Sequence, residues 1–210
     1  AAWGYPTSSK LPVYQPNNEH WEATFRELGW SPSTVGLFYQ VFHRLNTSCT
    51  GEVSFEEFIN FFELQKTKYT RRCFEYFATA GGNSINFLEF MVSVWNICTA
   101  NPDTLVNFAF DLYNLNSDGK LIYPEMKVLI EQLYGVAGKT TLIEKQCLAD
   151  LTNLAGTSDS AFSLENFAFF ASNHSMLLYP AFQIQQSIQQ RVLGLNYWKK
   201  IRDQQEKRRK

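Results

Sequence analysis

Features that identify most enzymes are missing from this chain of 210 residues. Its three histidines, His20, His43 and His174, share no spacing that suits a metal site or a catalytic triad. There is no glycine-rich phosphate loop, and no cysteine stands in a nucleophile motif. We therefore expect a protein without catalytic activity.

Cysteine pairs and long apolar runs are also lacking. The four cysteines lie far apart and form no Cys-x-x-Cys pair, which is typical of reduced thiols in the cytoplasm. No apolar run is long enough to cross a membrane, and no signal peptide opens the sequence. These absences predict a cytoplasmic protein with no transmembrane segment.

Net charge is almost absent, at -1, so the composition as a whole does not predict nucleic-acid binding. The charge is nevertheless uneven. Residues 191–210 contain eight Lys or Arg and two acids, a net of +6, so the remainder of the chain carries -7. A basic tail on an acidic body indicates a partner-binding surface and leaves the fold undetermined.

Methionine is scarce and aromatics are abundant, with 3 Met against 18 Phe, 10 Tyr and 5 Trp. Promiscuous helix-binding proteins use flexible, Met-rich grooves. A groove lined by Phe is stiffer and suits one dedicated partner. The composition therefore favours a permanent subunit over a protein that exchanges between many targets.

A repeat begins near Trp21, with a spacing of roughly 30 to 45 residues. Its four copies are EVSFEEFINFF, SINFLEFMVSV, KLIYPEMKVLI and AFSLENFAFFA. In each copy an apolar residue stands four positions before an acid or amide, and an apolar helical stretch precedes each copy. Helix–loop–helix units of this kind pair, and we expect short backbone pairing of Val53 with Ile85 and of Leu121 with Phe162.

The stretch FDLYNLNSDGKLIYPE closely resembles an EF-hand, and the layout of four units resembles the EF-hand superfamily of calcium sensors. The stretches FRELGW, EFMVSVWNICTA and FAFDLYN are most similar to the neuronal calcium sensor and calcineurin-B-like branches. The resemblance implies an all-α fold with two pairs of EF-hands. We expect an extended arm over 1–20, a first pair over 21–99 with loops 46–57 and 78–89, a second pair over 100–173 with loops 114–125 and 155–166, and a basic amphipathic helix over 174–210.

Calcium loops need oxygen ligands at positions 1, 3, 5, 7 and 9, a glycine at 6 and an acid at 12. Loops 78–89 and 155–166 lack most of these, whereas loop 46–57 is a weak candidate with one carboxylate. Loop 114–125 is the credible site. The candidate ligands are Asn114, Asn116, Asp118, Lys120 through its carbonyl, and Glu125 in this loop, and Asn46, Ser48, Thr50 and Glu57 in the weaker one.

The glutamates at position 12 have a second interpretation. Ser54 with Glu57, and Asn86 with Glu89, have the spacing of a helix N-cap pair that needs no metal. Ile122 cannot cap, which favours a ligand role for Glu125. With two carboxylates, loop 114–125 is expected to bind calcium weakly, with a Kd of ~10⁻⁵ to 10⁻³ M. A metal-independent loop and a functional calcium site both remain open.

The C-terminal segment carries one helical apolar stripe, although Gly194 interrupts it. Three interpretations compete: the stripe folds into the protein's own groove, as the resemblance favours; it docks on a partner; or the basic end lies on an anionic surface such as a membrane, an acidic tubulin tail or nucleic acid. The residues proposed for partner binding are Phe182, Ile184, Ile188, Val192, Leu195, Trp198, Lys207, Arg208 and Arg209.

These patterns predict a non-catalytic EF-hand adaptor or structural subunit that binds a protein partner in a larger assembly, with at most one weak calcium site. A cytoskeletal or ciliary assembly in the cytoplasm is our expectation. The alternative is a calcium-regulated sensor that switches partner binding through loop 114–125.

Overall fold

The computed structural model describes residues 13–16, 18–79, 83–116, 118–134, 141–157 and 160–209; the side chains of 206, 208 and 209 are outside this set. Residues 1–12 and 17 of the expected arm therefore lie outside the described residues. Residues 13–16 have no regular secondary structure. Within them, Tyr14 donates a hydrogen bond to Glu22 at 2.6 Å and packs edge-on against Phe25 and Tyr39.

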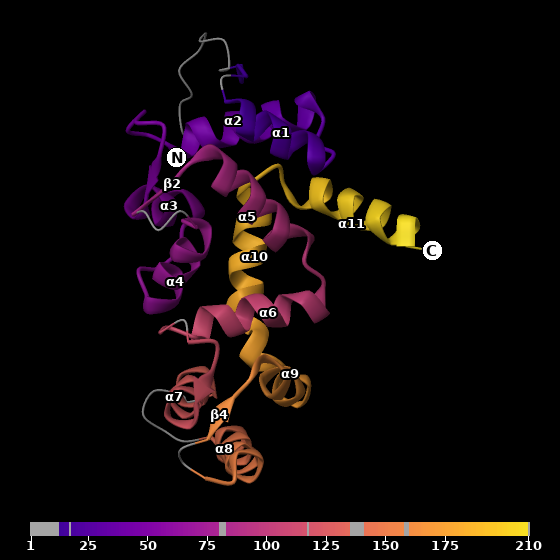
Figure 1. The fold of residues 1–210 in the computed structure, drawn as a ribbon. Helices are drawn as coiled ribbons and strands as arrows, with labels where there is room; N and C mark the ends of the chain where they lie inside the picture. The colour runs from indigo at the N-terminus through magenta and orange to yellow at the C-terminus, as the bar shows by residue number, and fades with distance from the viewer. Residues whose placement is uncertain are drawn as a thin grey trace, which may run out of the picture.

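The fold is all-α, as expected, with two very short sheets (Figure 1). In chain order the elements are α1 Glu19–Glu27, α2 Pro32–Leu45, β1 Val53–Ser54, α3 Phe55–Phe62, α4 Lys68–Phe77, β2 Ser84–Ile85, α5 Phe87–Thr99, α6 Pro102–Tyr113, β3 Leu121–Ile122, α7 Tyr123–Tyr134, α8 Leu142–Ala155, β4 Ala161–Phe162, α9 Leu164–Asn173, the 3-10 helix η1 Ser175–Leu178, α10 Tyr179–Arg191 and α11 Leu195–Arg209.

Polar caps define where many of these helices begin. The Ser54 hydroxyl accepts the Glu57 backbone N–H while the Glu57 carboxylate accepts the Ser54 N–H, and Asn86 and Glu89 form the same reciprocal pair. Both capping pairs were predicted from the sequence, and both are confirmed. They start α3 and α5 by satisfying backbone donors that a helix leaves unpaired at its first turn.

The strands hold the loops together in pairs. In the first pair β1 and β2 are antiparallel, with Val53 opposite Ile85, and in the second β3 and β4 are antiparallel, with Leu121 opposite Phe162. These are the predicted registers. The paired residues Val53 and Ile85, and Leu121 and Phe162, are at most 2% exposed, and their packing joins two helix–loop–helix units without requiring a metal.

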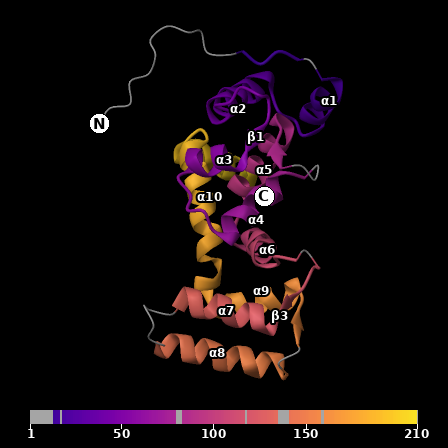
Figure 2. The ribbon, with the colours of Figure 1, turned by 90° about the vertical axis from the view of Figure 1, so that its left-hand side faces the viewer.

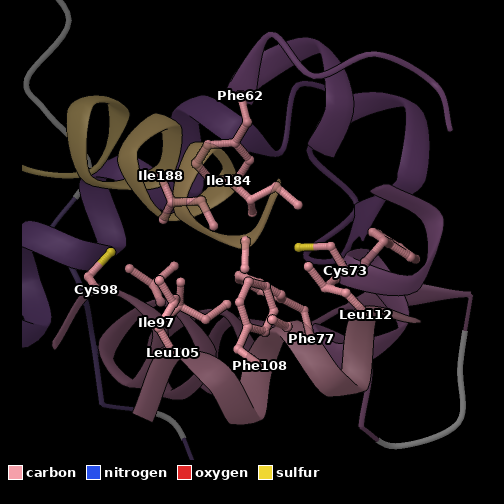
Figure 3. Packing of buried hydrophobic residues seen from close by; sticks show 14 of the residues in the cluster. Phe62, Cys73, Phe77, Ile97, Cys98, Leu105, Phe108, Leu112, Ile184 and Ile188 are labelled. Carbon is pink, nitrogen blue, oxygen red and sulfur yellow. The ribbon is translucent and has the colours of Figure 1, made fainter. Parts of the chain in front are cut away.

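One continuous apolar core, rich in aromatic rings, runs through both halves of the molecule. Helices α1 and α2 lie at one end, α7 and α8 lie at the other, and α10 runs along the molecule between them (Figures 1 and 2). From α10, Ile184 and Ile188 point into the cluster that contains Phe62, Phe77 and Phe108 (Figure 3). The C-terminal segment is therefore an internal part of the core.

The expected single helix over 174–210 is observed as the 3-10 helix η1 followed by two α-helices, α10 and α11. Leu193 and Gly194 separate them, with φ of 63° and 82°. A left-handed conformation at two successive residues stops a right-handed helix. Leu193 adopts a positive φ although it has a Cβ atom. Gly194, which has none, adopts a positive φ readily and completes the turn. Among the described residues no helix has the length and apolar character that spanning a membrane requires.

Candidate functional site

Asn114, where α6 ends, occupies the first position of loop 114–125 and is 4% exposed. Its side-chain oxygen Oδ1 is buried and accepts no hydrogen bond. Within the described part of the chain, it is the one buried side-chain polar atom in this state. Buried acceptors are almost always paired, since leaving one unpaired costs roughly 1–3 kcal/mol. This oxygen is thus available to a ligand of the loop.

The other ligand candidates of loop 114–125 are arranged around the same turn. Asp118 Oδ2 accepts from the Asn116 amide at 3.1 Å, and Asp118 Oδ1 accepts from the Lys120 backbone N–H at 2.9 Å. Gly119 has φ of 75°, the conformation that a calcium loop requires at its sixth position. Glu125 Oε2 accepts from the Ile122 N–H at 3.0 Å, whereas Ile122 offers no side-chain cap in return.

This oxygen set fits a hard cation such as calcium. Side chains of Asn114, Asn116, Asp118 and Glu125, with the Lys120 carbonyl, would hold it. When bound, calcium would supply positive charge to the two carboxylates and a partner to the orphaned Asn114 oxygen. Only two carboxylates are available, and the described residues contain no cluster of three or more acidic, His or Cys side chains suited to a metal. Affinity is therefore expected to be low.

Loop 46–57 has the same outline but satisfies its own oxygens. Glu57 accepts from Thr47 Oγ1 at 3.0 Å, from the Ser48 N–H at 2.8 Å, and from Ser54 N and Oγ at 2.8 and 2.9 Å. Asn46 Oδ1, the counterpart of the orphaned oxygen, accepts from Ser48 Oγ at 3.1 Å. Protein donors therefore occupy the places that a cation would take in this loop.

The hydrogen bonds of loop 46–57 also set the pKa of Glu57. Partial burial raises this pKa, but hydrogen bonds from Ser54 and Ser48 outweigh burial and lower the pKa to about 2. The folded state therefore binds the carboxylate proton more weakly than the unfolded chain, whose glutamate pKa is about 4.3. The resulting stabilisation is present above the unfolded pKa and is lost as pH falls toward 2.

Replacing Glu57 with Gln should lower the free energy of unfolding by about 1–2 kcal/mol at neutral pH, because charged acceptors are lost. The difference between wild type and Glu57→Gln should shrink as pH falls from about 5 toward 2. Urea unfolding followed by circular dichroism over this pH range measures both effects. A difference that stays constant with pH would contradict the assigned role of the carboxylate.

The two remaining loops have lost most ligands. Glu89 is 9% exposed and accepts from Thr79 Oγ1 at 3.1 Å and from the Asn86 N–H at 2.9 Å. In the fourth loop Ser163 caps α9 by accepting the Asn166 N–H. Ala80, Gly82 and Asp159, which the sequence places at ligand positions, lie outside the described residues.

The residues proposed for partner binding separate into buried and exposed groups. Ile184, Ile188, Val192 and Trp198 are buried against the protein's own helices, so in this structure they are not accessible to a partner. Phe182 and Leu195 are 48% and 43% exposed, and Lys207 is exposed. The side chains of Arg208 and Arg209 lie outside the described residues.

Polar residues that the sequence analysis missed hold α10 in place. Gln185 donates to the carbonyls of Ile97 and Ala100 at 2.7 and 2.9 Å, and Gln189 donates to the Cys98 carbonyl at 2.9 Å. These bonds bring side-chain donors to carbonyls at and just after the C-terminal end of α5, where a helix supplies few donors of its own. The signal was present in the sequence, since two glutamines four residues apart border the apolar stripe.

No protein-family model matches the chain. Similar curated proteins include calcineurin B of Naegleria gruberi, 25% identical over 177 residues, which make up 82% of this chain and 95% of that protein. Calcineurin B type 2 of Homo sapiens is 27% identical over 130 residues, which make up 60% of this chain and 75% of that protein.

A third relative is much longer. Lysophosphatidylcholine acyltransferase 2B of Rattus norvegicus is 23% identical over 130 residues, 60% of this chain, and the chain spans 25% of its length. Among solved structures, a PP2A PR70 holoenzyme chain is 16% identical with a TM-score of 0.46; the match covers 67% of this chain and 55% of that chain.

Proposed function

We propose that this chain, an EF-hand protein similar to calcineurin B, is a non-catalytic subunit that binds a partner protein and carries one weak calcium loop at 114–125. One contrast carries the calcium part of the proposal: Asn46 Oδ1 accepts a hydrogen bond from Ser48 within its own loop, whereas Asn114 Oδ1, at the same loop position, accepts none. The fold is closed without metal at loop 46–57, and loop 114–125 retains a ligand oxygen.

Exposed apolar side chains support a partner surface on the second half of the chain. Phe169 on α9 is 64% exposed, and Met176 on η1 and Phe182 on α10 are 41% and 48% exposed. Elements α9, η1 and α10 follow one another directly in the chain, and η1 contacts both helices. Large apolar side chains gathered on consecutive elements are typical of protein-binding surfaces.

The second candidate is a sensor that binds its partner only when loop 114–125 is loaded. The orphaned Asn114 oxygen favours it, because a cation would change the environment of a buried group where α6 ends. The two candidates differ in whether partner binding needs calcium.

A cytoskeletal or ciliary location stays a prediction, which imaging of the tagged protein in cells would check.

We expect the protein to retain its partner when it is purified from cells in chelator, and to lose it when Phe169 and Phe182 are both replaced by Ser. A severalfold loss of the captured partner, quantified by mass spectrometry, is the expected size, because exposed aromatic anchors dominate such interfaces. Leu142→Ser, at a side chain that is 82% exposed on α8, is the matched control. Retention that appears only with added calcium would favour the sensor.

A further inference from the structure

Helix α11 is set at a defined position by one buried residue. Trp198 is 0% exposed, its indole N–H donates to the Val192 carbonyl at 2.6 Å, and its ring packs against Phe38 and Trp95 at centroid distances of 6.0 and 5.9 Å. Figure 1 shows α11 crossing from α10 past α5, with its C-terminal end away from the other helices. The body of the protein therefore presents this helix in a fixed direction.

The two faces of α11 have different roles. At 3.6 residues per turn, the buried Trp198 and the partly buried Ile201, Arg202 and Gln205 share the inner side. The opposite side is exposed. It spans an arc of about 100° around the helix axis and a length of roughly 12 Å along that axis. We call this side the outer face of α11; its charged residues are Lys199, Lys200, Asp203 and Lys207.

The charges of the outer face have no ion-pair partners among the described residues. Arg191, at the end of α10, pairs with Glu63, whereas Lys199, Lys200 and Lys207 form no ion pair with any side chain that the structure describes, although the body is acidic as a whole. Cations in the last turn of a helix are explained by the helix dipole. That explanation covers Lys207 but not Lys199 and Lys200, which lie in the first half of α11.

The pattern of the outer face distinguishes between anionic partners. A helix that binds a membrane inserts an apolar face, but Trp198, the largest apolar side chain of α11, is already packed in the core. Asp203 projects at about 40° on the arc, between Lys199 at 0° and Lys207 at about 80°. A carboxylate in the middle of the face would be repelled by an array of phosphates, whereas a protein segment can match it with a basic side chain.

We propose that the outer face of α11 is a docking surface for an acidic segment of a protein partner, in which Lys199, Lys200 and Lys207 bind carboxylates and Asp203 binds one basic side chain. The proposal rests on the proposed function of a partner-binding subunit and names the chemistry of the partner.

The test uses the whole protein and a labelled helical peptide whose charges complement the outer face: two adjacent glutamates, a lysine three to four positions on, and a further glutamate four positions beyond the lysine. A second peptide of the same composition has the lysine moved to an end. Fluorescence anisotropy at low and physiological salt measures the affinity, since exposed charge pairs weaken as salt rises. Vesicles containing phosphatidylserine and a short DNA duplex are the other probes.

The complementary peptide is expected to bind more tightly than the rearranged one. The double variant Lys199→Glu, Lys200→Glu should weaken its binding about tenfold, and Lys145→Glu, an exposed reversal on α8, should leave it unchanged. Asp203→Lys should weaken peptide binding severalfold. Circular dichroism verifies that each variant is folded.

Failure to bind the peptide at low salt would overturn the proposal. Binding of vesicles or duplex in preference to the peptide, increased by Asp203→Lys, would also overturn it and would identify a phosphate-bearing partner. Either failure leaves the subunit role intact, because that role is tested separately through Phe169 and Phe182.

Discussion

Replacing Trp198 with Ala is expected to lower the free energy of unfolding by about 3–5 kcal/mol, the range for removing a large aromatic side chain from a packed core. The variant loses the ring contacts with Phe38 and Trp95 and leaves the Val192 carbonyl without its indole donor. It also releases the position of α11. Urea unfolding monitored by circular dichroism measures the loss.

Leu195 offers a matched control for Trp198. Both residues belong to the same predicted stripe, three positions apart, yet Leu195 is 43% exposed and Trp198 is 0% exposed. Leu195→Ala should therefore change stability by less than about 1 kcal/mol. Equal losses in the two variants would show that Trp198 does not anchor α11 in the core.

Asn114→Asp should tighten calcium binding about tenfold or more, because it places a third carboxylate at the first ligand position of loop 114–125. Without calcium, the same variant should be less stable by about 1–3 kcal/mol, since the new carboxylate replaces a buried oxygen that already lacks a donor. Isothermal titration of chelator-stripped protein measures the first effect, and urea unfolding in chelator measures the second.

Two control variants separate the loop from the rest of the protein. Asn46→Asp makes the same change in loop 46–57, where the side-chain oxygen already has a donor and Glu57 is saturated; we expect no new calcium site there. Asp118→Ala with Glu125→Ala should abolish any calcium heat of the wild type. A gain in calcium affinity for Asn46→Asp equal to that for Asn114→Asp would mean that the hydrogen bonds of loop 46–57 do not exclude a cation.

Local features of the fold were predictable because their causes lie within a few residues. Capping by Ser54 and Asn86 depends on an acid three positions on, and the registers of the two strand pairs follow from apolar residues at matching positions of the repeat. The weakness of the calcium loops also follows from counting carboxylates. None of these inferences requires knowledge of distant contacts.

Other features of the site and of its surroundings depended on three-dimensional geometry that residue types do not specify. Nothing in the residue types separates Asn46 from Asn114 at the first loop position, yet one oxygen is hydrogen-bonded and the other is buried alone. The left-handed conformation of Leu193 is equally invisible in the sequence, because leucine has no preference for it. The bonds from Gln185 and Gln189 to α5 join residues more than eighty positions apart.

By itself the sequence determined an all-α chain of four paired helix–loop–helix units, three of them poor in metal ligands, and a C-terminal apolar stripe. An apolar stripe predicts that one face of a helix is buried, but the helical spacing of its residues does not indicate which surface covers that face. Only the tertiary structure decided that Ile184, Ile188 and Trp198 are buried in the protein's own core and that Lys199, Lys200 and Lys207 face outward. Which of these residues are buried depends on the long-range packing of α10 and α11 against α3, α5 and α6, and no local sequence pattern contains this information.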